Sequence, residues 1–571
     1  MYGSLYLIFT LFSGCITEQP VETQKPQAQT DNLSPANTPN SPPGAQQPLP
    51  PIDAHGGKPN PVVKLGPRLT IKAPPSDQRQ GDSKASCSDC DIFLISVCSL
   101  RKDYVGVYGL TPSPTPAIDS LANGGYTFDR TFAASNFTLA SLTAMLTGHF
   151  GASTGVTGWD KGLTKTLPTI PEVLGYYGYK TAAFTIDAAS GFRPDYGLHR
   201  GFQRMELSSA PRSTPDGRYQ QAPAAEIQEK GASTKAAVRW LGEQNDEKPI
   251  FLMFHDRTAH YPFVISEEGI EEDSTGVTRV LWEAGHQNNN RKNQERVMPG
   301  MAGGTQQKGI VGFQGTDPVH TLLRQGGAET MKVYTSHYRA GVQRMDYDIQ
   351  KLIEAQKQRK RFDKTLWILV ADHGESLGDH NELLHGASFY NSVINVPLII
   401  KAPNFPGNQT KSKALLSHVD LLPTILEYVG ATIPAGIDGV SMLPLLRGEA
   451  EQIRSVTISE GGVAQPKGEM PGAVIAPPWA LLLQEIGCDA PVDHSPPRRP
   501  GEVAKCLYNL DKDPTQSQLI SRNEPKVVAN LYALWKKIRS DRTTVEQTLR
   551  LDPAFVEELQ RTGYDFQSPE K

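Results

Sequence analysis

The chain has 571 residues, enough for one large domain with a satellite or for two to three domains. Its 57 lysines and arginines stand against 61 aspartates and glutamates, so the formal net charge is -4 and the basic surplus typical of nucleic-acid binders is absent. We therefore expect no nucleic acid as a partner. No run of about 18 apolar residues occurs, so no strong transmembrane helix is predicted.

The first 15 residues are apolar and end in small residues before Cys15. They resemble a bacterial lipoprotein signal, with cleavage before Cys15 and a lipid on its sulfur, although no Lys or Arg precedes the apolar run. The resemblance implies a protein of the bacterial cell envelope, in the outer membrane or periplasm, that contacts the membrane through this anchor. The alternative is an apolar N-terminus without that role.

Residues 16–88 form a polar, proline-rich segment, with 14 prolines between residues 16 and 85. Such a composition buries too little apolar surface to order the chain, so we predict a disordered tether. Further on, Cys488 and Cys506 flank a polar, Pro-rich loop and could form a disulfide in an oxidising compartment. Cys87 and Cys90 are a lone C-x-x-C, which favours a local disulfide or free thiols over a zinc ribbon. Cys98 is then left unpaired.

From residue 89 to residue 451, short apolar runs alternate with helical patterns. Strands are predicted at 92–97, 181–186, 250–254, 366–370 and 396–400, and helices at 115–124, 139–146, 167–177, 233–244 and 336–358. This alternation predicts an α/β fold, a doubly wound and mostly parallel sheet with helices on both faces. Residues 264–330 are polar and Gly-rich, which indicates an inserted loop or lid near the site, or a disordered segment.

Residues 452–571 change character again. Apolar runs at 456–459, 479–483 and 506–509 suit a small antiparallel sheet, and a helix is predicted from about 525 to 540. We therefore expect a C-terminal antiparallel α+β subdomain beside the larger domain.

The segment 366–385 carries the strongest functional signal. Asp372 and His373 directly follow a buried strand, and His385 comes soon after. Because ligands bind beyond the carboxyl ends of strands in open α/β sheets, this pair can offer a carboxylate oxygen and an imidazole nitrogen to one metal ion. The alternative is a polar surface loop with a helix N-cap.

This segment resembles the sulfatase-like family of the alkaline phosphatase superfamily. The matching motifs are Asp-His-Gly-Glu at 372–375, His-Gly at 385–386, the strand at 396–400, and further segments at 95–125, 136–148, 249–263, 417–426, 436–445 and 507–514. The resemblance spans about residues 91 to 540. It implies a metal-dependent hydrolase of sulfate or phosphate esters, acting on a small-molecule, glycan or lipid ester, with Asp372 and His373 as metal ligands.

The sequence departs from the family after its first strand. Family members usually carry a metal-binding Asp where this chain has Cys98, and Ser99 follows. A Cys98 thiolate suits zinc, or manganese, better than calcium, which prefers oxygen ligands. Arg101 lies in the same segment and is expected to contact substrate.

Thr138 aligns with the family's nucleophile. A threonine cannot become the formylglycine of sulfatases, and relatives with Thr there are mostly phosphodiesterases and phospho-group transferases. Beside a dication, the Thr138 hydroxyl could attack phosphorus; the alternative role is a helix N-cap. His260 and His385 match substrate-contacting histidines that could protonate the leaving group, unless His260 is an incidental loop residue.

Two functions therefore remain open. The first is a hydrolase, or a Thr-nucleophile transferase or phosphodiesterase, with a divergent metal site. The second is a catalytically decayed lipoprotein that binds a glycan or a partner. Convergence of the Cys98 sulfur, the Thr138 oxygen, Asp372 and His373 on one point is what the first function requires.

Overall fold

The structure is a computed structural model. It describes residues 87–541, with gaps at 186–190, 208–211, 214–218, 221–230, 246, 262, 264–317, 406, 408, 463–467, 486 and 489–500. The predicted signal at 1–15 and nearly all of the predicted tether lie outside the described residues. Within them, no helix combines the length and the apolar character needed to cross a bilayer.

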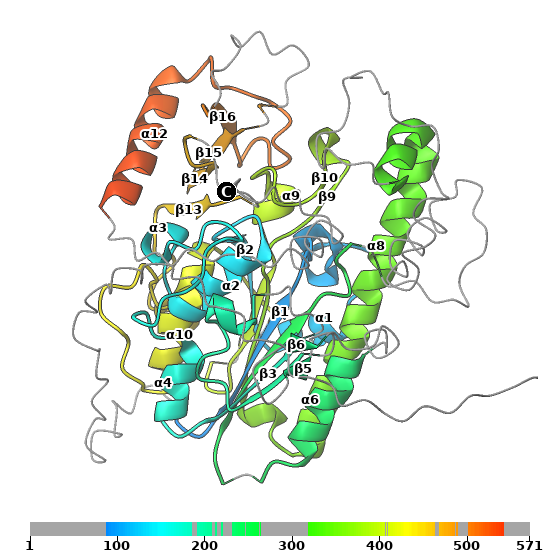
Figure 1. Ribbon diagram of the computed structural model, residues 1–571, viewed down its shortest axis with the longest axis vertical. Helices are drawn as coiled ribbons and strands as arrows, with labels where there is room; N and C mark the ends of the chain where they lie inside the picture. Colours follow the sequence, from blue (N-terminus) through cyan, green and yellow to red (C-terminus); the bar gives the residue numbers. More distant parts are fainter. Residues whose placement is uncertain are drawn as a thin grey trace, which may run out of the picture. The chain divides into compact units, whose positions relative to one another are not determined.

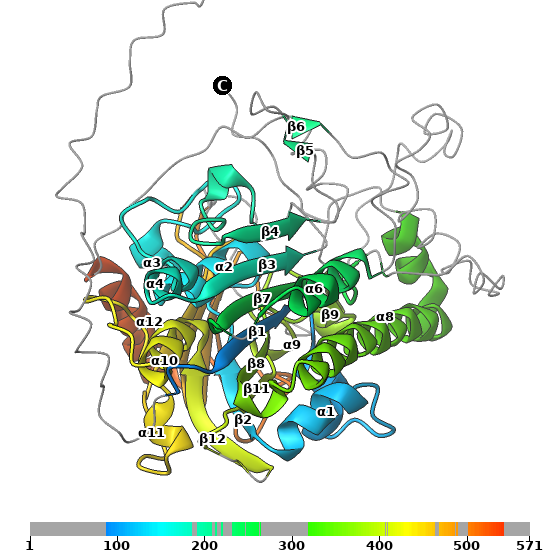
Figure 2. The same ribbon diagram turned by 90° about the horizontal axis from the view of Figure 1, so that it is seen from below.

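An eight-stranded sheet forms the centre of the larger domain (Figures 1 and 2). Its spatial order is β12 (Thr410–Ser417), β2 (Tyr126–Phe132), β11 (Leu398–Lys401), β8 (Thr365–Ala371), β1 (Asp91–Val97), β7 (Ile250–Asp256), β3 (Lys180–Thr185) and β4 (Arg204–Leu207). All neighbours pair in parallel except β11, which is antiparallel to both β2 and β8. The prediction of a mostly parallel sheet is confirmed.

The three central strands β1, β7 and β8 are buried at every position, as expected of strands covered on both faces. In Figure 2, α1 (Pro116–Asn123), α6 (Ala232–Gly242) and α8 (Pro318–Gln358) lie on one face of the sheet. On the other face lie α2 (Thr138–Thr147), α4 (Ile170–Tyr176) and α10 (Leu421–Tyr428). The sheet is therefore doubly wound, and the five predicted helices are all present.

Helix α8 is longer than predicted, since it begins at Pro318 instead of near residue 336. The last part of the predicted 264–330 insertion is thus helical, and 264–317 lies outside the described residues. The shorter elements are α3 (Gly151–Thr154), α9 (Asn391–Ile394), α11 (Leu443–Leu446), β5 (Arg212–Ser213), β6 (Tyr219–Gln220), β9 (Ser376–Leu377) and β10 (Leu383–Leu384).

The C-terminal sheet is an antiparallel meander of β13 (Thr457–Glu460), β14 (Gly472–Ala476), β15 (Trp479–Gln484) and β16 (Ala504–Asn509). Helix α12 (Pro525–Ser540) packs against β14 and β15 (Figure 1). A disulfide joins Cys488 to Cys506, as predicted. The predicted α+β subdomain is confirmed, with β14 as an additional strand.

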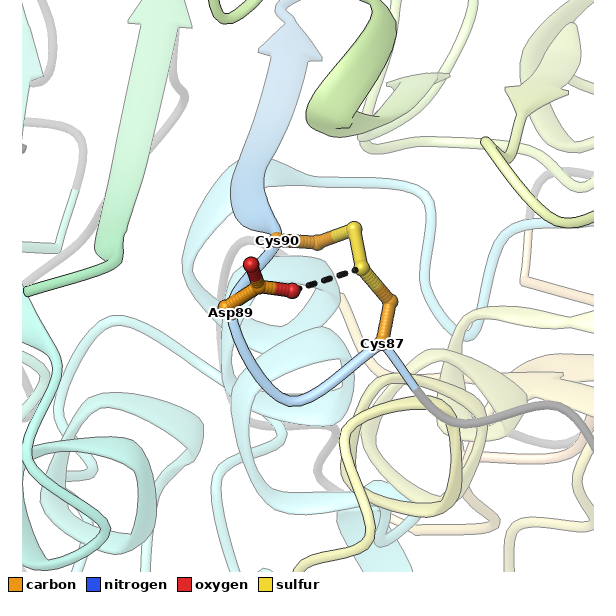
Figure 3. Close-up of side chains that lie close together, drawn as sticks. All are labelled: Cys87, Asp89 and Cys90. Atoms are coloured by element: carbon orange, nitrogen blue, oxygen red, sulfur yellow. Dashed lines mark hydrogen bonds between the residues drawn. A yellow bond between two sulfur atoms is a disulfide. The ribbon is translucent and has the colours of Figure 1, made fainter. Parts of the chain in front are cut away.

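The start of β1 carries a second disulfide, between Cys87 and Cys90 (Figure 3). The Asp89 carboxylate lies 3.5 Å from the Cys87 sulfur. Because both sulfur atoms are oxidised, the pair offers no thiolate to a metal ion. Among the described residues, Cys98 is the remaining cysteine, free and buried.

Candidate metal and catalytic site

The candidate site lies where β1, β7 and β8 run side by side. Ser96 in β1 is in register with Val370 in β8 and with His255 in β7. Because residues in register, and residues two apart along a strand, share one face of a sheet, Cys98 and Asp372 continue on the face that carries His255. The register of three strands thus brings a thiol, a carboxylate and an imidazole together.

One ligand atom each from Cys98, His255 and Asp372 lies within 4.8 Å of the others, and all three side chains are fully buried. The Thr138 hydroxyl oxygen lies 3.4 Å from the Cys98 sulfur and 3.2 Å from Nε2 of His373. Nε2 of His373 lies 3.5 Å from Oδ2 of Asp372. The four predicted groups therefore converge, and His255 joins them.

Two buried polar atoms in this cluster lack hydrogen-bond partners. Oδ1 of Asp372 accepts from the backbone N–H groups of Ser99, at 3.2 Å, and His373, at 2.7 Å, whereas Oδ2 has no hydrogen-bond partner. Nδ1 of His255 is 3.1 Å from the Ser96 hydroxyl, whereas Nε2 is unpartnered. Buried polar groups are nearly always satisfied, so these atoms indicate a site for a cation.

The turn after β1 fixes the Cys98 side of the cluster. Ser99 has a positive φ of 60°, uncommon for a residue with a side chain. This conformation directs its N–H to Asp372, and the Tyr338 hydroxyl donates to its carbonyl at 2.7 Å. Burial raises the pKa of Cys98 well above its usual value, so without a metal ion the thiol stays protonated.

His373 is oriented toward Thr138 by its own backbone. Nδ1 lies 2.8 Å from the Gly374 carbonyl, which can only accept, so Nδ1 carries the hydrogen. Nε2 is then an acceptor facing the Thr138 hydroxyl. Burial lowers the pKa of His373 to about 4, which keeps the imidazole neutral. It can therefore accept a proton from Thr138 or bind a metal ion.

Thr138 is the first residue of α2, and Phe137 is its N-cap. No side chain caps this helix, so the alternative prediction that Thr138 acts as an N-cap is wrong. Its hydroxyl instead points into the cluster. The helix N-terminus beside it favours a bound anion, because the first N–H groups of a helix point outward.

The other two predicted histidines extend the cluster, with His385 next to His373 and His260 next to His385. The ring of His385 lies 4.0 Å from that of His373 and 5.0 Å from that of His260, measured between centroids. Nδ1 of His385 lies 3.1 Å from Oε1 of Glu375, and burial raises the pKa of Glu375 to about 8. A guanidinium nitrogen of Arg257 lies 3.0 Å from Nε2 of His260. Glu375 and Arg257 were not predicted as site residues.

A sulfatase family model matches residues 91–431, more than half of the chain. The chain belongs to the sulfatase family. It is 23% identical to a Delta 4,5-hexuronate-2-O-sulfatase of Bacteroides thetaiotaomicron, over 76% of this chain and 86% of that protein. It is 22% identical to an arylsulfatase of Clostridium perfringens, over 62% and 78%. The phosphonate monoester hydrolase of Agrobacterium radiobacter has the same fold, with a TM-score of 0.57 and 18% identity over 81% of this chain and 98% of that one.

Sulfatases generally depend on a divalent metal ion. Calcium and magnesium require mostly oxygen ligands, and in this cluster only Asp372 supplies a carboxylate. A sulfur, a nitrogen and a carboxylate oxygen are the donor types that zinc accepts. The residues present therefore fit a zinc-like ion, which Cys98, His255 and Asp372 would hold, with His373 beside them.

Arg101, the predicted substrate contact, lies apart from this sulfatase cluster. Its guanidinium forms ion pairs with Asp103 and Asp379 and donates to the Glu375 carbonyl at 3.2 Å. It lines a cavity of about 230 Å³ whose other lining residues include none of the cluster. These bonds join the loop after β1 to the loop after β8, and the substrate contact of Arg101 stays a prediction.

Gly374 sets how closely the catalytic loop approaches α9. A Cβ at this position would lie 2.0 Å from the Ser392 carbonyl oxygen. We expect Gly374→Ala to displace His373 and to lower the melting temperature and any hydrolytic activity, the latter by about 10²-fold, since a shift of 1 Å is enough for such a loss. Differential scanning fluorimetry and an ester assay measure both effects.

Gly242→Ala is the matched control for this change. A Cβ at Gly242, the last residue of α6, would meet nothing within 4 Å. We expect this variant to keep the wild-type melting temperature and activity. Wild-type behaviour of Gly374→Ala as well would show that the loop after β8 is free to move away from α9.

Proposed function

We propose that this sulfatase-family protein is a metal-dependent hydrolase of phosphate or sulfate esters that uses Thr138 as its nucleophile. The observation that carries the proposal is the position of the Thr138 hydroxyl, 3.2 Å from the acceptor nitrogen of His373 and 3.4 Å from the Cys98 sulfur. A nucleophile, a base oriented by a third group and a set of metal donors thus occupy one buried cluster.

His373 takes the proton from the Thr138 hydroxyl, because Gly374 holds its Nδ1–H and leaves Nε2 as the acceptor. A divalent ion held by Cys98, His255 and Asp372 would supply Lewis-acid stabilisation of the anionic ester when bound. Thr138 then attacks the phosphorus or sulfur of the ester.

His385, which lies beside His373, and its neighbour His260 are the groups that we assign to the leaving group of the ester. Glu375 orients the ring of His385 through Nδ1, and we assign His385 to protonate the leaving-group oxygen. Arg257 adds a guanidinium beside His260, which supports binding of an anionic ester.

His385 protonates the leaving-group oxygen as the bond from that oxygen to phosphorus or sulfur breaks. It then takes a proton from the water molecule that attacks the Thr138 ester, while His373 returns its proton to the Thr138 oxygen as the ester bond breaks and the product leaves.

A phosphorus ester is the favoured substrate class. Thr138 cannot form the formylglycine of sulfatases, whereas its hydroxyl is a competent nucleophile toward phosphorus. The similar proteins include enzymes named for sulfated hexuronate, for N-acetylglucosamine 6-O-sulfate and for phosphonate monoesters. A small-molecule, glycan or lipid ester is therefore the substrate that we propose.

A second candidate function is that of a binding protein on a decayed sulfatase scaffold. The enclosure of the cluster favours it, since Cys98 and Asp372 are fully buried and Thr138 is 2% exposed. Such a protein would fold normally and would hydrolyse no ester with any metal ion.

Metal removal tests the first function against the second. The full chain is treated with a chelator, then assayed with zinc, manganese, magnesium or calcium against aryl phosphate monoesters, phosphodiesters, phosphonate monoesters and sulfate esters. We expect hydrolysis of at least one phosphorus ester that disappears with the chelator and returns with zinc or manganese. A folded protein that is inactive under every condition would overturn the proposed function.

A further inference from the structure

We propose that Cys98, His255 and Asp372 form a three-ligand zinc site, in which a thiolate replaces the usual first-strand carboxylate and an imidazole from β7 completes the set. The inference deepens the proposed function, on which it rests for the identity of the site, by assigning the ligands and the metal preference. Two observations support it: one ligand atom from each residue lies within 4.8 Å of the other two, and all three side chains are fully buried.

His255 is held like a ligand of a metal ion. Its Nδ1 is 3.1 Å from the hydroxyl of Ser96, its register partner in β1, which fixes the ring orientation. Nε2 has no partner although the side chain is fully buried, so it is the nitrogen left for the ion. An outer hydrogen bond to the second ring nitrogen is what metal-binding histidines generally have.

Asp372 presents one oxygen and anchors the other. Two backbone N–H groups bind Oδ1, which leaves Oδ2 as a single unpartnered donor. With the sulfur and the imidazole, this gives three protein ligands of three types, and catalytic zinc sites have three protein ligands and one open position. The Thr138 hydroxyl lies 3.4 Å from the Cys98 sulfur, next to this set of ligands.

Magnesium and calcium need about six oxygen ligands, and this cluster offers two, from Asp372 and Thr138. A thiolate and an imidazole suit zinc and cobalt instead. The replacement of the carboxylate by Cys98 therefore changes the metal preference of the site instead of removing the metal.

The test uses the full chain, stripped with a chelator and reloaded with zinc or cobalt chloride. We expect about one zinc per chain by mass spectrometry and a thiolate-to-cobalt charge-transfer band in the near ultraviolet. Cys98→Ser should lose the band, and His255→Gln should weaken zinc binding by about 10²-fold or more. His199→Gln is the matched control, because the charged neighbours of this half-buried histidine all lie outside the cluster.

Two further variants keep the test independent of folding. Ser96→Ala removes only the hydrogen bond to Nδ1 of His255 and should weaken zinc binding by about 10-fold, with an unchanged near-ultraviolet circular dichroism spectrum. Cys98→Asp should shift binding toward manganese, magnesium or calcium.

The outcomes separate this inference from the proposed function. A cobalt band that depends on Cys98 in a protein that hydrolyses no ester supports the zinc site and rejects the enzyme. Ester hydrolysis with magnesium or calcium and no thiolate band keeps the enzyme and overturns the zinc site. Absence of metal in the wild type, with uptake by Cys98→Asp, also overturns it.

Discussion

Replacing Thr138 with valine should lower kcat/KM for any ester substrate by about 10³-fold or more, which is the size of effect seen when a nucleophile is removed. Valine keeps the shape of the side chain but has no hydroxyl, so His373 loses its hydrogen-bond partner and no covalent ester can form. The loss should appear in kcat more than in KM, because the bond is made only on the way to the transition state.

Thr143→Val is the matched control for this variant. Thr143 lies in the same helix, and its hydroxyl donates to the Leu139 carbonyl at 2.7 Å, outside the cluster. We expect it to keep nearly full activity, and Thr138→Ser to keep part of it, because a serine retains the attacking oxygen. Equal activity of wild type and Thr138→Val would mean that another group, or a water molecule, attacks the ester.

The sequence predicts the catalytic edge of the sheet well because its strands are buried on both faces. Strands β1, β7 and β8 read as mainly apolar runs and were predicted to within about two residues. Strand β12 gave no such run, because its first half is polar and largely exposed at the edge of the sheet. Strand β2 was missed because Asp129 and Arg130 interrupt it.

Some of the site residues could likewise be predicted from the sequence, and others could not. Asp372, His373, Thr138 and Cys98 follow motifs that resemble those of the sulfatase family, so a sequence alone points to them. His255 lies inside a strand, and only the register of β7 against β1 places it opposite Ser96 and next to the cluster. Arg257 and Glu375 contact histidines only three and ten residues away, His260 and His385, so their signal lay in the family-like segments 249–263 and 372–386. The sequence did contain a signal for His255, because it is an ionisable residue near the end of an otherwise apolar run.

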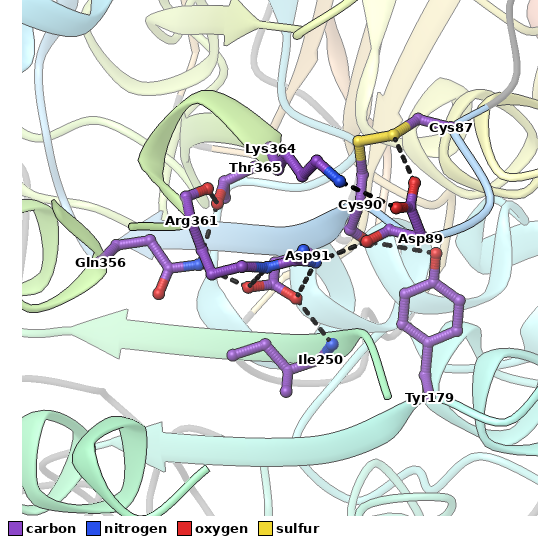
Figure 4. The surroundings of a disulfide bond; sticks show 10 residues. All are labelled: Cys87, Asp89, Cys90, Asp91, Tyr179, Ile250, Gln356, Arg361, Lys364 and Thr365. Atoms are coloured by element: carbon purple, nitrogen blue, oxygen red, sulfur yellow. Dashed lines mark hydrogen bonds and ion pairs between the residues drawn. A yellow bond between two sulfur atoms is a disulfide. The ribbon is translucent and has the colours of Figure 1, made fainter. Parts of the chain in front are cut away.

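The second large effect that we expect is a loss of stability when Asp91 is replaced. Asp91 begins β1, at the end of the strand opposite to Cys98. Asp91 is fully buried, and its carboxylate accepts hydrogen bonds from Gln356 at 2.6 Å and from the Ile250 backbone N–H at 3.1 Å. Arg359 and Arg361 form ion pairs with it at 3.1 and 3.2 Å. Figure 4 shows Arg361, Gln356 and Ile250 around this carboxylate, next to the Cys87–Cys90 disulfide. One side chain thus ties β1, β7 and the end of α8 together.

Asp91→Ala should lower the free energy of unfolding by about 3–5 kcal/mol, because it removes a buried carboxylate that pairs with two nearly buried guanidinium groups. Urea unfolding followed by tryptophan fluorescence measures the change. Lys364→Ala is the control: its ion pair with Asp89 joins side chains that are 58% and 66% exposed, so its removal should change the same free energy by less than about 1 kcal/mol. A similarly small effect of Asp91→Ala would show that Arg359 and Arg361 reach solvent once the carboxylate is gone.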